Sequence, residues 1–157
     1  MVSKTIPFLN DESDNQARFL EVKILDYRMI CVYVPNGNPI DSEKYLYKLN
    51  WLNKLYEYCE KINLTNEKII IGGDFNIIQE SFDCYDTNAW TNDALFSDEV
   101  KRLLRQIKNL GFLDSFRVLK PNLQRYSFWD YQSGAWQKDN GIRTVSYTHL
   151  TLPTTEA

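Results

Sequence analysis

Apolar and polar positions in the first part of the chain follow the two-residue repeat of β-strands. Residues 18–24 alternate between apolar and polar side chains, which is typical of a half-buried strand. Residues 29–34 then form an almost continuous apolar run, which ends at the turn-forming residues Pro35, Asn36 and Gly37. The pattern therefore predicts two successive strands.

The following segment changes to a repeat of three and four residues, which indicates a helix that buries one face. Asp41 or Ser42 can cap its first turn. Residues 68–71 form a short β-branched strand that runs into Gly72 and Gly73. This order of strand, helix and strand predicts an α/β fold with a buried sheet. The apolar positions of the helix are Tyr45, Leu49, Leu52, Leu55, Tyr56, Cys59 and Ile62.

A second helix is predicted after Ser97, which can cap it, and before Gly111, which can end it. Its apolar stripe is Val100, Leu103, Leu104, Ile107 and Leu110. Residues 112–131 are rich in aromatic side chains and are expected to be mainly loop. The pattern breaks down after Arg143, so we expect one domain over residues 14–143 and a non-native or disordered tail over residues 144–157.

Composition supports one soluble globular domain, since the 157 residues are 43% apolar and 14% aromatic, with a formal net charge of -3. The charge is unevenly distributed, because residues 101–143 hold nine Lys and Arg against three Asp and Glu. Such a basic segment suits contact with a phosphate backbone, although a solvated helix face with basic loops explains it equally well.

The cysteines and the apolar runs bear on location. Cys31, Cys59 and Cys84 lie far apart and form neither a CxxC pair nor a zinc-ligand spacing with His149. Reduced thiols and a cytoplasmic location are therefore expected. No apolar stretch reaches the roughly 18 residues that span a bilayer, so no membrane association is expected.

Candidate chemistry is concentrated where the predicted strands end. Asp74 and Asn76 follow the strand at residues 68–71, where two glycines allow a phosphate to approach the backbone. Strand alternation would put both side chains on one side, where a carboxylate could bind a divalent cation or activate water. A simple turn capped by Asn76 remains the alternative. Tyr33 ends the preceding strand and would reach the same edge if the two strands are neighbours.

Residues 126–136 interleave aromatic side chains with cations, which provides stacking surfaces and phosphate contacts. Most of these rings are expected to close the core, with one or two facing outward.

Four motifs occur in an order that resembles the exodeoxyribonuclease III family of the endonuclease/exonuclease/phosphatase superfamily. The similarity covers about residues 14–143, and the motifs are YVPNG at 33–37, GDFN at 73–76, YSFWDY at 126–131 and DNGIR at 139–143. The resemblance implies a four-layer α/β sandwich of two packed sheets with helices outside, here without its N- and C-terminal strands. It also implies a monomeric hydrolase that uses Mg²⁺ or Mn²⁺ to cut double-stranded DNA at abasic sites and to trim 3′ ends.

The resemblance also implies roles for single residues. Tyr33, Asp74 and Asn76 match catalytic positions, and Asp74 and Asn76 also match metal ligands. Phe128 and Trp129 match rings around the sugar that lacks its base, a small group that such a pocket can select. The remaining substrate-binding matches are Arg18, Asn36 and Arg143.

The chain departs from the family pattern at both ends. Nothing upstream of Asp14 resembles the family's strands with an Asn and a metal-binding Glu, and residues 144–150 read TVSYTHL where the family continues through Ile to Asp. His149 has no Asp before it, so the catalytic His of the family's final Ser-Asp-His motif is not assigned to it. We therefore expect a chain that is truncated at both ends and nearly inactive.

Two other functions remain open from the sequence. A phosphatase of the same superfamily, acting on small phosphate esters, would keep Asp74 and Asn76 without needing Phe128 and Trp129. A non-catalytic DNA-binding fragment would need only the basic segment at residues 101–143.

Overall fold

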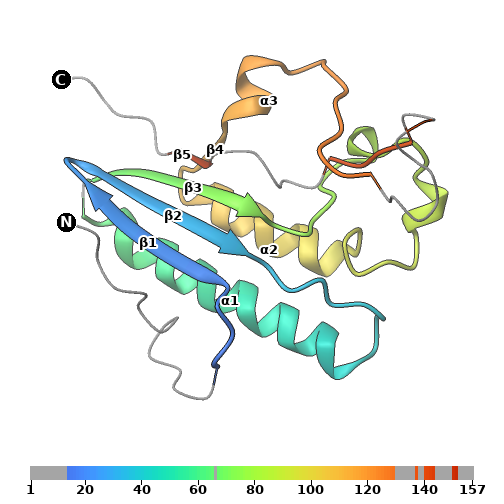
Figure 1. The fold of residues 1–157 in the computed structure, drawn as a ribbon, viewed down its shortest axis with the longest axis horizontal. Coiled ribbons are helices and arrows are strands. Elements are labelled where there is room, and N and C mark those ends of the chain that lie inside the picture. The colour runs from blue at the N-terminus through green and yellow to red at the C-terminus, as the bar shows by residue number, and fades with distance from the viewer. Residues whose placement is uncertain (1–13, 66, 130–136, 138–139, 144–149, 152–157) are drawn as a thin grey trace.

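The computed structural model describes residues 14–65, 67–129, 137, 140–143 and 150–151, and it combines one sheet with two long helices (Figure 1). The sheet has five strands in the order β1-β2-β3-β5-β4. The elements in chain order are β1 (Phe19–Ile24), β2 (Tyr27–Tyr33), α1 (Glu43–Asn63), β3 (Lys68–Asp74), the 3-10 helices η2 (Ser81–Asp83) and η3 (Asn88–Trp90), α2 (Asp98–Asn109), β4 (Leu113–Asp114), α3 (Ser115–Leu119) and β5 (Leu150–Thr151).

Strands β1, β2 and β3 form the long part of the sheet. β1 and β2 are a hairpin, and β2 and β3 run parallel from the pair Tyr27↔Lys68 to the pair Tyr33↔Asp74. Parallel neighbours need a crossover, and α1 supplies it. The predicted strand, helix and strand thus lie side by side, and the predicted α/β class is confirmed.

Helices α1 and α2 pack against each other on one face of the sheet (Figure 1). Each begins at the predicted serine: the Ser42 hydroxyl accepts a hydrogen bond from the Tyr45 amide, and the Ser97 hydroxyl accepts one from the Val100 amide. The main core lies between these helices and the sheet. Its fully buried side chains include Trp51, Leu52, Leu55, Ile69, Ile71, Leu103, Leu104 and Phe112.

The other face of the sheet is apolar and open. Leu20 and Ile24 of β1 are 45% and 52% exposed, whereas their neighbour Glu21 points to the helix side and is 3% exposed. Glu21 tolerates burial because it pairs with Arg28 and accepts a hydrogen bond from the Tyr58 hydroxyl. The open face forms a hollow of about 410 Å³ lined by Leu20, Val22, Ile24, Met29, Ile30, Cys31, Ile70, Gly72 and Gly73.

The short elements were not expected from the sequence, the 3-10 helices η2 and η3 included. β4 and α3 interrupt the segment predicted as loop, and β5 lies within the segment predicted as a non-native or disordered tail. β5 pairs with both β3 and β4. The other tail residues, His149 included, lie outside the described residues. The described part of the chain holds one sheet, so the predicted pair of packed sheets stays a prediction.

None of the helices within the described residues has both the length and the apolar character required to cross a membrane.

Candidate active site

Tyr33 and Asp74 are direct neighbours at the carboxyl ends of β2 and β3. They are the last pair of the parallel register, so the two residues lie side by side at this edge of the sheet. The Tyr33 side chain leaves the open face, because Val32, which precedes it, is buried on the helix side. Tyr33 is 52% exposed. The structure therefore brings together the phenol and the carboxylate that were predicted to share this edge.

Asn76 is held at the same edge by hydrogen bonds. β3 ends at Asp74 and Asn76 has a φ of 48°, so strand alternation, used above to place the two side chains together, does not extend to Asn76. Instead, the Asn76 amide donates to Asp74 Oδ1 at 2.9 Å, and Asn76 Nδ2 donates to the Val34 carbonyl at 2.8 Å. The Asp74 side chain thus caps the local turn, where the alternative interpretation expected Asn76 to do so, and the Asn76 side chain ties the end of β3 to the end of β2.

Arg18 and Asn36 flank this edge. The Arg18 guanidinium lies 4.8 Å from the centre of the Tyr33 ring and donates to the Tyr33 carbonyl at 3.3 Å. Asn36 is exposed, and its Oδ1 accepts a hydrogen bond from the Asn38 amide at 3.1 Å. A cation and an exposed amide therefore lie on the loops next to Tyr33.

Phe128 and Trp129 lie in a separate segment, tied to the chain near Ile142. The Phe128 amide donates to the Ile142 carbonyl at 3.0 Å, and Phe128 is 47% exposed. Trp129 packs edge-on against Tyr126, with ring centres 6.5 Å apart. One ring of the predicted pair thus faces solvent. Asp130, Tyr131 and Trp136 fall outside the described residues.

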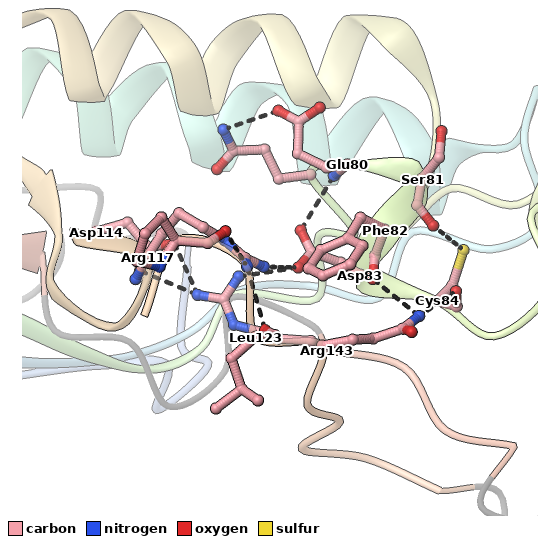
Figure 2. A network of polar contacts seen from close by, with 12 residues as sticks. Glu80, Ser81, Phe82, Asp83, Cys84, Asp114, Arg117, Leu123 and Arg143 are labelled. Atoms are coloured by element: carbon pink, nitrogen blue, oxygen red, sulfur yellow. Dashed lines mark hydrogen bonds and ion pairs between the residues drawn. The ribbon is translucent and has the colours of Figure 1, made fainter. Parts of the chain in front are cut away.

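Arg143 lies in a buried ion-pair network rather than at the surface, and this corrects the expected contact with substrate (Figure 2). Its guanidinium donates to Asp83 Oδ1 at 3.0 Å and to both carboxylate oxygens of Asp114 at 2.9 and 2.7 Å. Arg143 is 4% exposed and Asp83 is 1% exposed. Arg117 also reaches Asp83 Oδ1, at 2.6 Å. The geometry gives Arg143 a structural role, because its charge is already matched by two carboxylates.

Lys48 was missed from the sequence and lies directly beneath the candidate site. It is fully buried in α1, and its ammonium donates to the carbonyls of Asn36, Asn76 and Ala94 at 2.9, 2.7 and 3.1 Å. Burial lowers the pKa of Lys48 to about 7, and the charges of Asp93 and Asp74 partly oppose this shift. The available signal was its position, since Lys48 lies three residues after Tyr45 and four before Leu52 on the apolar face of the helix.

The candidate site holds few acidic groups. Within the part of the chain that the structure describes, no three His, Cys, Asp or Glu side chains cluster so as to hold a metal ion.

Comparisons with known proteins agree with the geometry. No family model matches the chain. An exodeoxyribonuclease from Bacillus subtilis (strain 168) is 29% identical over 134 residues, which cover 85% of this chain and 52% of that protein. The solved structure of an AP endonuclease from Archaeoglobus fulgidus matches with a TM-score of 0.84 and 34% identity, over 92% of this chain and 56% of that one.

A third relative was solved with DNA. A 3′ phosphatase from Neisseria, bound to a product DNA hairpin, matches with a TM-score of 0.86 and 31% identity, over 95% of this chain and 56% of that one. The chain thus spans about half the length of the relatives it matches. The resemblance to exodeoxyribonuclease III inferred from the four motifs is confirmed, because the chain is similar in both sequence and fold to exodeoxyribonucleases and AP endonucleases.

Proposed function

We propose that this protein is a metal-dependent DNA-repair nuclease, which hydrolyses phosphodiester bonds of double-stranded DNA at abasic sites and at 3′ ends. The observation that carries the proposal is the parallel register that places Tyr33 beside Asp74 on one open edge of the sheet. Relatives described as exodeoxyribonuclease and AP endonuclease support it. A 3′ phosphatase bound to a DNA hairpin supports DNA as the polymer that is recognised.

The three side chains at the strand ends have complementary roles in this reaction. The Asp74 carboxylate accepts a proton from the attacking water. The oxygen of that water then bonds to phosphorus while the bond from phosphorus to the leaving oxygen breaks. The Tyr33 phenol donates a hydrogen bond to the phosphate or to the leaving oxygen. Asn76 contacts the phosphate without adding negative charge, and its backbone bond to Asp74 Oδ1 keeps the carboxylate oriented.

The donor set suits a hard divalent cation that the substrate helps to bind. Mg²⁺ commonly takes one or two carboxylates and completes its shell with water and substrate phosphates. Asp74 supplies the carboxylate and Asn76 an amide oxygen, so these residues fit Mg²⁺ or Mn²⁺. When bound, the cation offsets the negative charge that builds up on the phosphate.

Two further groups support duplex DNA as the partner, one beside Tyr33 and one in the separate segment near Ile142. Arg18 places a cation beside Tyr33, and the half-exposed Phe128 offers a ring to a sugar or base. An abasic sugar is unpaired and small, so moving it out of the helix costs little. We further propose that the protein acts as a monomer in the cytoplasm.

Cleavage of a duplex oligonucleotide that carries a single abasic site tests the proposal. With the protein in excess, we expect a nick at the abasic site that requires Mg²⁺ or Mn²⁺, disappears with EDTA and disappears in Asp74→Asn. A second duplex with a 3′ phosphate end measures action at 3′ ends. A nick rate that is the same with wild type and Asp74→Asn would overturn the proposal.

Trp129→Ala separates the alternatives. A DNA nuclease should lose abasic-site cleavage in this variant and keep little activity on small phosphate esters. If the wild type hydrolyses small phosphate esters but not DNA, and Trp129→Ala hydrolyses the esters at the same rate, the protein is the superfamily phosphatase. Salt-dependent DNA binding that survives Asp74→Ala, without turnover in any metal, would indicate the non-catalytic fragment.

A further inference from the structure

Three loops that build or border the candidate site meet at one buried cation. The loop after β2 carries Asn36, the loop after β3 carries Asn76, and the turn before α2 carries Ala94. The Lys48 ammonium has three N–H donors, and each carbonyl takes one of them. The donors of the lysine and the carbonyls are thus matched one to one, although the three loops are far apart in the sequence.

Further bonds make the same loops one connected unit. Asn38 Oδ1 accepts from the Ala94 amide at 2.9 Å, and Asn38 Nδ2 donates to Asp93 at 3.0 Å. The Ile78 amide donates to the Leu95 carbonyl at 2.7 Å. Lys48 lies at the centre of this unit, as the one side chain among these contacts that bonds to all three loops at once.

The backbone near Lys48 is shaped to admit its side chain. Gly37 has a φ of 85°, and a Cβ at Gly37 would lie 2.5 Å from Lys48 Cδ. A glycine is therefore needed where the loop passes over the lysine stem.

We propose that Lys48 is a positioning residue for the candidate site: its ammonium sets the backbone conformation of the loops that carry Asn36 and Asn76, and through Asn76 the orientation of Asp74. The contact acts on the Asn76 carbonyl, while the Asn76 amide and side chain bond to Asp74 and Val34. Asn76 has a positive φ of 48°, a backbone region that is uncommon for L-residues and that Asn adopts more readily than most. The expected effect of Lys48 on DNA cleavage rests on the proposed function, whereas its effect on the conformation of the loops does not.

Lys48→Met tests the proposal, with Leu55→Ala as the matched control. Leu55 is also fully buried on α1, and its truncation lowers global stability without removing a bond to the loops. Amide hydrogen exchange is measured in both variants under conditions of equal global stability. We expect the amides of Asn76 and Ala94 to exchange at least about tenfold faster in Lys48→Met than in Leu55→Ala, with Ile30 of β2 unchanged. Equal exchange at Asn76 and Ala94 in the two variants would overturn the proposal.

Kinetics supply the second readout. If the wild type cleaves abasic DNA, Lys48→Met should lower kcat about tenfold or more and change KM little. The substitution misaligns the reacting groups on the loops but leaves the groups that bind DNA in place. Leu55→Ala should keep the wild-type kcat per folded molecule. Faster exchange of the Asn76 and Ala94 amides in Lys48→Met, together with no DNA cleavage by the wild type, would overturn the proposed function and support the role of Lys48. Cleavage with a wild-type kcat in Lys48→Met would overturn that role.

Discussion

Gly73 controls the site at the scale of a single backbone position. It precedes Asp74 in β3 and has a φ of 128°, in a region that L-residues rarely adopt. A Cβ at this position would lie 2.1 Å from the Val32 carbonyl oxygen in the adjacent strand. Because that atom belongs to the backbone of β2, it cannot move without breaking the register that pairs Tyr33 with Asp74.

Gly73→Ala should therefore lower the free energy of unfolding by about 3 kcal/mol or more, through backbone strain and the clash together. Gly72→Ala is the control, since Gly72 lines the open hollow and is not among the glycines with positive φ. Urea unfolding followed by circular dichroism measures both variants. An equal decrease in the free energy of unfolding in the two variants would show that the close approach of Gly73 to β2 does not determine which residue position 73 accepts.

Single buried charges were the hardest features to predict from the sequence. Lys48 and its acceptor Asn76 are 28 residues apart, and Arg143 and Asp83 are 60 apart. No local pattern encodes such a pairing, so Arg143 was placed at the surface and Lys48 was not singled out. Tyr33 and Asp74 could be predicted because each ends a strand whose own pattern is clear.

At the scale of elements, the Arg143 network joins three segments that are far apart in the sequence. Asp83 closes η2, Asp114 caps α3, and Arg143 follows the bridge between Ile142 and Phe128. Asp114 accepts a hydrogen bond from the Arg117 amide at 3.0 Å, so one carboxylate caps a helix and holds an ion pair. The network thereby fixes the segment that carries Phe128.

Arg143→Met should lower the free energy of unfolding by about 3 to 5 kcal/mol, because it leaves Asp83 and Asp114 buried without their main partner. Arg117→Met should lower it by only about 1 kcal/mol, because that side chain is 24% exposed and Asp83 keeps its bond to Arg143. Urea denaturation at neutral pH provides both values. Similar losses in the two variants would contradict the assignment of Arg143 as the central cation.

Elements with strong local signals were predicted and short ones were not. α1, α2 and the first three strands have clear periods, serine caps or glycine ends, and the structure places them close to the expected residues. β4 and β5 have two residues each and exist through pairing with distant strands, which no window of sequence reveals. α3 has five residues and follows Asp114, a cap that was not recognised.

At the scale of the whole molecule, the sheet has one face under the helices and one open face. Cys31 lies on the open face and is exposed, whereas Cys59 and Cys84 are buried. Burial also raises the pKa of Cys59 to about 12, which keeps it in the unreactive thiol form at neutral pH. Cys31 and Cys59 therefore report on the two sides of the sheet.

Reaction of the folded protein with a thiol reagent at pH 8 should modify one cysteine rapidly, and Cys31→Ser should abolish this fast phase. Cys59 and Cys84 should react only after denaturation. Mass spectrometry of the labelled peptides identifies the sites. Slow reaction of Cys31 would show that the open face is covered in solution, and fast reaction of Cys59 would contradict the packing of α1 on the sheet.

The central claim is that Tyr33 and Asp74, side by side at the ends of β2 and β3, act together on a DNA phosphate. Single-turnover cleavage of abasic duplex DNA by wild type, Tyr33→Phe and Asp74→Asn tests it most directly. The account predicts that Asp74→Asn lowers the cleavage rate by about 10² to 10⁴, that Tyr33→Phe lowers it less, and that DNA affinity hardly changes. Cleavage by Asp74→Asn at the wild-type rate would contradict the account.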